Sequence, residues 1–184
     1  MTAFKWLLIT VIDVALLVTL PIAPPIIAAF TKRMPYGLEP YGWGGLWGTY
    51  DNPPQGDEGF VSKRAIFPGV VDGAKGYANR VQWMWRNKLY GFAKIAGVKW
   101  SDGVVISYAG NPDISDKEKR PGWYFAKAKR NDKLVAFEFY AILPYSDSRN
   151  CRIRIGWKIM TDKFQRYGFA QHVFTLNPFD GYGK

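Results

Sequence analysis

Cys151–Met160, which reads CRIRIGWKIM, is the stretch that most clearly indicates the secondary structure of the chain. Apolar and mostly basic residues alternate along it with a period of two. This period is typical of a strand with one buried face and one exposed face. The pattern predicts that Ile153, Ile155 and Trp157 lie in the core, and that the arginines and Lys158 lie outside. A slip of one residue in register would exchange the two faces.

Four further stretches of the C-terminal half predict strands, because they are rich in β-branched or aromatic residues and are separated by turn residues. They are Val104–Ala109, Trp123–Arg130, Leu134–Leu143 and Phe169–Leu176. The third of these is apolar on both faces except for Glu138, which is typical of a central strand. Asn131-Asp132 predicts a tight hairpin turn. The predicted fold class is therefore α+β, with an antiparallel sheet of about five strands.

The N-terminal segment is apolar, and Asp13 is the only ionisable residue between Trp6 and Ala29. We expect a helix from Thr2 to Leu20, because Pro21 removes a backbone donor, and a kinked or extended exit after it. About 20 apolar residues are enough to span a bilayer. The leading interpretation is a membrane anchor. A helix buried in an oligomer and a cleaved signal peptide remain alternatives.

One more helix is predicted in the remainder of the chain, where Asn79–Leu89 has a broad apolar face and Asn79 can serve as the N-cap. The chain then divides into three segments. Residues 1–33 form the apolar anchor helix with its Pro-rich exit. Residues 34–60 form a loop of glycine and aromatic residues with an acidic turn. Residues 61–184 form a basic, β-rich domain.

Charge is distributed unevenly along the chain. The protein has 25 Lys and Arg against 15 Asp and Glu, which gives a net charge of +10. Residues 61–184 hold 22 of the basic residues and 10 of the acidic ones. Positive charge favours the cytoplasmic side of a membrane and attracts the phosphates of lipid or nucleic acid. We therefore expect the C-terminal domain to be cytoplasmic, where the single Cys151 suits a reducing compartment.

The acidic turn supplies weak candidates for a metal site. Asp51, Asp57 and Glu58 offer oxygen ligands for a hard cation, but their spacing does not match an EF-hand loop. The favoured interpretation is a structural turn. In it, Asp51 and Asp57 accept hydrogen bonds from turn N–H groups or from Arg80 or Arg86.

A basic face is predicted on the sheet, and a solvated surface is its favoured interpretation. Binding of single-stranded nucleic acid is the weaker alternative. Its residues are Lys127, Lys129, Arg152, Arg154 and Lys158. No catalytic residue is predicted, because neither the single His172 nor Cys151 has a readable partner. The chain has no P-loop or GxGxxG motif, and we expect no cofactor and no enzymatic activity.

Three separated motifs resemble an uncharacterised protein family encoded by tailed bacteriophages and prophages. The motifs are YDNPPQGD at Tyr50–Asp57, WMWRNKLYGF at Trp83–Phe92, and GWKI at Gly156–Ile159 followed by Asn177-Pro178-Phe179. The resemblance implies a phage origin, and it brings no established activity.

The leading hypothesis is a non-enzymatic, membrane-associated phage protein at the host inner membrane, of an accessory or exclusion type. Its partners would be the lipid membrane, copies of itself or other phage proteins. The first alternative is a structural component of the virion whose apolar helix is buried between subunits. The second is a small basic β domain that binds nucleic acid.

Overall fold

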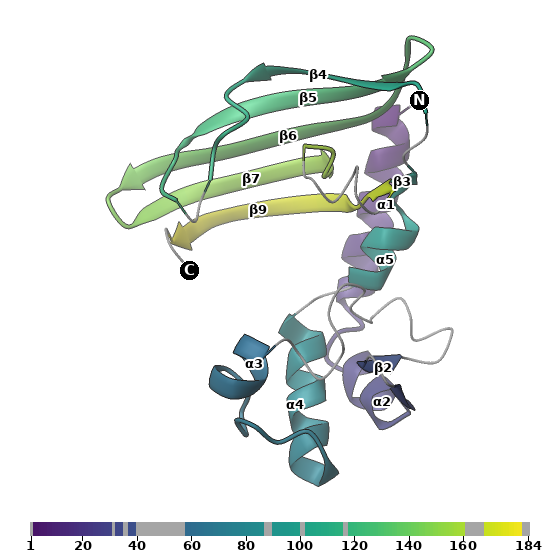
Figure 1. Ribbon diagram of the computed structural model, residues 1–184, viewed down its shortest axis with the longest axis vertical. Helices are drawn as coiled ribbons and strands as arrows, with labels where there is room; N and C mark the ends of the chain where they lie inside the picture. The colour runs from purple at the N-terminus through teal and green to yellow at the C-terminus, as the bar shows by residue number, and fades with distance from the viewer. Residues whose placement is uncertain are drawn as a thin grey trace. The chain divides into compact units, whose positions relative to one another are not determined.

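The computed structural model of the protein describes residues 2–30, 32–34, 37–39, 58–86, 90–99, 102–115, 118–160 and 168–181 (Figure 1). The chain forms two compact units. The sheet unit consists of Met1–Thr10 and Ala96–Lys184, and the helical unit consists of Val11–Ile95.

Five strands of the described chain form one antiparallel sheet, in which neighbours in space are also neighbours along the chain (Figure 1). They are β4 (Val104–Gly110), β5 (Gly122–Arg130), β6 (Lys133–Ser146), β7 (Arg149–Trp157) and β9 (His172–Gly181). The short strand β8 (Phe169–Ala170) pairs instead with β3 (Val98–Lys99). The predicted α+β class with a five-stranded antiparallel sheet in the C-terminal half is therefore confirmed.

The turn between β5 and β6 has the conformation that a tight hairpin requires. Asn131 and Asp132 both have positive φ, +49° and +60°. Two such residues in succession twist the chain in the sense that matches the right-handed twist of the strands. The hairpin predicted at Asn131-Asp132 is therefore confirmed.

The N-terminal helix α1 (Thr2–Leu17) begins at the predicted residue and ends three residues before the predicted end. A turn follows, in which the Thr19 hydroxyl donates to the Leu16 carbonyl at 2.6 Å. A second helix, α2 (Ala23–Ala29), starts directly after this turn. Its two prolines lie in its first turn, where the missing N–H has no intrahelical acceptor to lose. The sequence pattern did not predict this helix.

Across the described part of the chain, no helix combines the length and the apolar character needed to cross a membrane. The predicted N-terminal apolar helix is present, and its role as a membrane anchor stays a prediction.

The helical unit contains further elements: α3 (Glu58–Lys63), α4 (Gly73–Arg86), α5 (Tyr90–Ile95) and the antiparallel pair β1 (Lys32–Met34) and β2 (Gly37–Glu39). Helix α4 packs against α2 through Val81 and Met84, which form one buried cluster with Ile27 and Ala28. The Tyr77 hydroxyl donates to the Pro25 carbonyl at 3.0 Å across the same contact.

Helix α4 begins six residues before the predicted N-cap, so the prediction of Asn79 as a cap is wrong. Asn79 lies inside the helix and is 3% exposed. Its carboxamide accepts from the Phe67 N–H at 3.0 Å and donates to the carbonyls of Phe67 and Val70 at 2.8 and 2.7 Å. The side chain therefore satisfies the backbone of the loop before the helix rather than the start of the helix.

We expect Asn79→Ala to lower the free energy of unfolding by about 2–3 kcal/mol, because it leaves the part-buried Phe67 N–H and Val70 carbonyl without their partner. Gln82→Ala is the matched control. Gln82 forms hydrogen bonds with the same loop, at the Ile66 N–H and the Arg64 carbonyl, but these bonds are exposed to water. Gln82→Ala should therefore lower the free energy of unfolding by less than about 1 kcal/mol. Urea unfolding measures both changes. Equal losses for the two variants would contradict the assigned role of Asn79.

Candidate functional site on the two faces of the sheet

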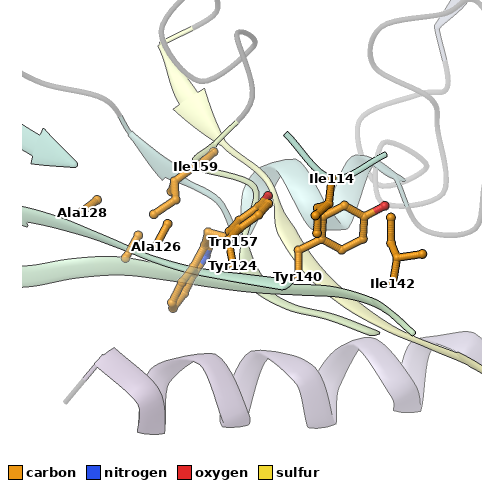
Figure 2. Packing of buried hydrophobic residues seen from close by; sticks show 10 residues of the cluster. Ile114, Tyr124, Ala126, Ala128, Tyr140, Ile142, Trp157 and Ile159 are labelled. Carbon is orange, nitrogen blue, oxygen red and sulfur yellow. The ribbon is translucent and has the colours of Figure 1, made fainter. Parts of the chain in front are cut away.

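The register of the strands assigns each side chain of the sheet to one of two faces. The helix-side face is the one on which the first residues of α1 pack, and the opposite face points away from α1. Figure 2 shows Tyr140 and Ile142 on the opposite face, with α1 beneath the sheet as the pale purple helix. The helix-side face includes Trp123, Phe125, Lys127, Lys129, Phe137, Leu143, Trp157, His172, Phe174 and Leu176.

The centre of the opposite face is a buried carboxylate. Glu138, on the central strand β6, is 0% exposed. Its Oε1 accepts from the Tyr124 hydroxyl at 2.9 Å and from Arg154 Nε at 2.7 Å. Its Oε2 accepts from the backbone N–H groups of Ile159 and Met160, both at 2.8 Å. Both oxygens are thus occupied by donors, which leaves this carboxylate in a structural role.

Arg154 compensates the charge of Glu138. Its guanidinium lies 2.6 Å from the carboxylate and stacks 4.6 Å from the centre of the Tyr140 ring. Burial lowers the pKa of Arg154, but the Glu138 carboxylate, Tyr124 and Tyr140 together raise it, and the net shift is upward. Burial and the same carboxylate raise the pKa of Tyr124 well above its usual range. The hydroxyl therefore stays protonated and continues to donate.

The prediction that Arg152 and Arg154 belong to the basic face is wrong. Both side chains lie on the opposite face, where the core is most completely buried. Arg154 pairs there with Glu138, and Arg152 pairs with Asp180 at 3.2 Å. The strand itself ends at Trp157, so Lys158 lies beyond it. The remaining residues of the predicted set, Lys127 and Lys129, are exposed on the helix-side face.

The reason for this correction is that strand alternation divides side chains between faces without saying which face is buried. Trp157 is fully buried, as predicted, whereas Ile153 and Ile155 are only half-buried on the helix-side face. Glu138, the lone acidic residue of an otherwise apolar central strand, was the sequence signal that an arginine has a partner within the protein. The signal could not identify which arginine, because only the pairing of β6 with β7 brings Glu138 beside Arg154.

We expect Glu138→Gln to lower the free energy of unfolding by about 3–5 kcal/mol, because the variant leaves the charge of Arg154 without its partner. Glu118→Gln is the matched control. It removes the same charge from an exposed pair with Arg120, and should cost less than about 1 kcal/mol. Combining Glu138→Gln with Arg154→Met should cost less than the sum of the two single changes. Urea unfolding that shows additive losses would contradict a direct interaction.

The first three turns of α1 are tied to the sheet by polar contacts as well as by packing. The Thr2 hydroxyl donates to the Leu134 carbonyl at 2.8 Å, and Trp6 Nε1 donates to the Val173 carbonyl at 3.3 Å. The Trp6 ring contacts Phe137 and Phe174 edge-on, with centroids 6.0 and 6.2 Å apart. The N-terminal part of the apolar helix is therefore part of the core of the sheet unit.

His172 completes this contact. Its Nε2 lies 3.1 Å from the Thr10 hydroxyl oxygen, and that hydroxyl already donates its one hydrogen to the Trp6 carbonyl. We therefore assign the ring hydrogen to Nε2, which donates to Thr10. Burial lowers the pKa of His172 to about 4. The imidazole is neutral in the folded protein, and its role is to hold α1 on β9.

This shift predicts a loss of stability in acid. Between pH 6.5 and pH 4 the unfolded chain binds a proton at His172 that the folded chain does not, so this contribution is complete above pH 6.5 and decreases as the pH falls towards 4. Relative to His172→Gln, the parent should lose about 1–2 kcal/mol more between pH 7.5 and pH 4.5, a value that allows for screening by solvent. Unfolding in urea at the two pH values measures this difference. Identical pH dependence of parent and variant would contradict the assignment.

The residues predicted for the acidic turn lie outside what the structure describes. This holds for Asp51, Asp57 and the side chain of Glu58, so neither the metal interpretation nor the ion pairs are tested. Arg80 donates to the Val71 carbonyl at 3.2 Å, and burial lowers its pKa more than Asp72 raises it. Arg86 is exposed.

Within the described ranges, neither a pocket nor a group of metal ligands provides a second well-defined site. A pocket of about 370 Å³ is lined by Gly59, Phe60, Lys63, Arg64 and Arg86. The described residues contain no group of three or more His, Cys, Asp or Glu side chains placed to hold a metal ion.

These observations define a class of protein: an α+β protein built on a five-stranded antiparallel meander, with an apolar N-terminal helix packed on one face of the sheet. The whole chain, residues 1–184, matches the family described as "Family of unknown function (DUF7338)", and the protein belongs to that family. No curated protein and no solved structure matches the chain.

Proposed function

We propose that this chain is a non-enzymatic, membrane-associated protein of a tailed phage that acts at the inner membrane of the host, with its sheet unit on the cytoplasmic side. The observation that carries the proposal is the outer side of α1, which faces solvent although it is apolar. Its exposed side chains are Phe4, Leu7, Leu8, Val11, Ile12 and Val14.

Helical geometry separates this outer side from the inner one. Phe4, Leu8 and Val11 follow one another at spacings of four and three residues, which place them along one side of the helix. Trp6, which contacts the sheet, lies on the other side. A helix with one apolar side free can lie in the plane of a bilayer interface, with that side about 5–10 Å into the boundary between headgroups and acyl chains. Such binding does not require the helix to span the bilayer.

Two further observations support the proposal. The net charge of +10 favours a surface of anionic lipid, where each nearby Lys or Arg contributes about 1 kcal/mol. The three sequence motifs support the phage origin. They also leave open the alternative of a virion component, in which the same side of α1 would be buried against neighbouring subunits.

We expect Leu7→Asn combined with Val11→Asn to weaken binding to anionic liposomes at least tenfold, because both side chains lose favourable transfer from water. Ile66→Asn combined with Ile95→Asn is the matched control. These two residues are exposed to a similar degree, at 57% and 69%, against 53% and 59% for Leu7 and Val11, but they lie off α1. Liposome flotation of the full chain measures the binding.

The control variant should float like the parent, and all variants should unfold at similar urea concentrations because exposed substitutions cost little. A parent chain that stays at the bottom of the gradient would contradict the proposal. Discrete oligomers of the parent without detergent, which the α1 variant disperses, would instead support the virion alternative.

A further inference from the structure

The helix-side face continues beyond the part that α1 covers, and its remainder is apolar and exposed. Helix α1 contacts this face around Phe137, His172 and Phe174. Farther along the strands, Trp123 is 49% exposed and Leu176 is 63% exposed. The register places these two side chains in one cross-strand row with Ala141 and Ile153, and a contiguous apolar surface is unusual where a protein meets only water.

The charge on this face has a single sign within the described strands. Lys127 and Lys129 are exposed on β5, and the Lys127 ammonium lies 5.4 Å from the centre of the Phe125 ring. Phe125 in turn contacts Phe137, with the ring centres 6.3 Å apart, and Phe137 contacts Trp6 of α1, so Lys127 lies next to the α1 contact. The carboxylates of these strands, Glu138 and Asp180, pair with the arginines on the other side of the sheet.

We infer that the exposed part of the helix-side face, which carries Lys127, Lys129, Trp123 and Leu176, is a docking surface for anionic phospholipid. The inference rests on the proposed membrane association and adds a second contact to it. Lys127 and Lys129 bind lipid phosphates, while Trp123 and Leu176 enter the headgroup region, where tryptophan is favoured.

The position of α1 supports a contact of this face at the level of the lipid headgroups. The helix lies on the same face and, with its side chains, is about 10–12 Å across. An interfacial helix whose apolar side enters about 5–10 Å below the headgroup boundary therefore places the neighbouring sheet surface at the level of the headgroups. The lysines and the lipid phosphates then lie at similar depth.

Other occupants fit this surface less well. A second copy placed face to face would bring the lysines of both chains towards each other without carboxylates between them. Single-stranded nucleic acid requires rings on which successive bases stack, whereas two of the exposed apolar side chains on this face, Leu143 and Leu176, are aliphatic.

The test compares the full-length parent with three double variants in binding to vesicles of zwitterionic lipid, with and without 30% anionic lipid. Lys127→Gln with Lys129→Gln should weaken binding to the anionic vesicles about 10- to 30-fold and reduce its salt dependence. Lys75→Gln with Lys99→Gln removes the same charge from exposed positions outside the five-stranded sheet and should bind like the parent. Trp123→Ser with Leu176→Ser should weaken binding to both kinds of vesicle.

The outcomes separate this inference from the proposed function. If the α1 variant Leu7→Asn/Val11→Asn loses binding while the sheet-face variants bind like the parent, the docking surface is overturned and membrane association remains. If the parent binds neither kind of vesicle, both are overturned. Loss of single-stranded oligonucleotide binding in the lysine variant with unchanged vesicle binding would assign the face to nucleic acid. Loss of a parent dimer in the Trp123 variant with unchanged vesicle binding would assign it to a second copy.

Discussion

The sheet unit depends on one buried carboxylate. Glu138 sits in the central strand and accepts hydrogen bonds from β5, from β7 and from the segment that follows β7. A charge buried this completely is tolerated only when its oxygens are filled and its charge is paired, and both conditions are met. The interaction therefore ties β5 and β7 to the two sides of β6 and holds the path of the chain as it leaves β7.

The same sheet uses its two faces for different purposes. On the opposite face, partly buried cations are neutralised by carboxylates of the same sheet: Arg154 by Glu138 and Arg152 by Asp180. On the helix-side face, Lys127 and Lys129 stay in solvent next to apolar side chains. Lysine suits such a surface because its ammonium is strongly hydrated, whereas the planar arginine side chain suits a buried pair. The basic character of the chain is thus divided between structure and surface.

Helix α1 connects the fold to the proposed membrane contact. Its inner side is held on the sheet by Trp6, Thr10 and His172, and its outer side is apolar and exposed. A segment that the sequence presents as one continuous apolar run therefore has two environments. Within the sheet unit, the packed side orients residues 2–10, so that the exposed side chains of this part of the helix point away from the sheet.

The sequence by itself determined the elements that local physics controls. The period of two along β7, the turn residues Asn131 and Asp132 and the start of α1 all followed from patterns within a few residues. The sequence did not determine what each face meets. Arg154 pairs with a residue 16 positions away, and Asn79 satisfies a loop that precedes its own helix. Such contacts depend on strand order and on the path of a loop, which no local period encodes. That Arg152 and Arg154 are partly buried and paired followed only from the tertiary fold, because a charge removed from water needs a partner that distant parts of the chain supply.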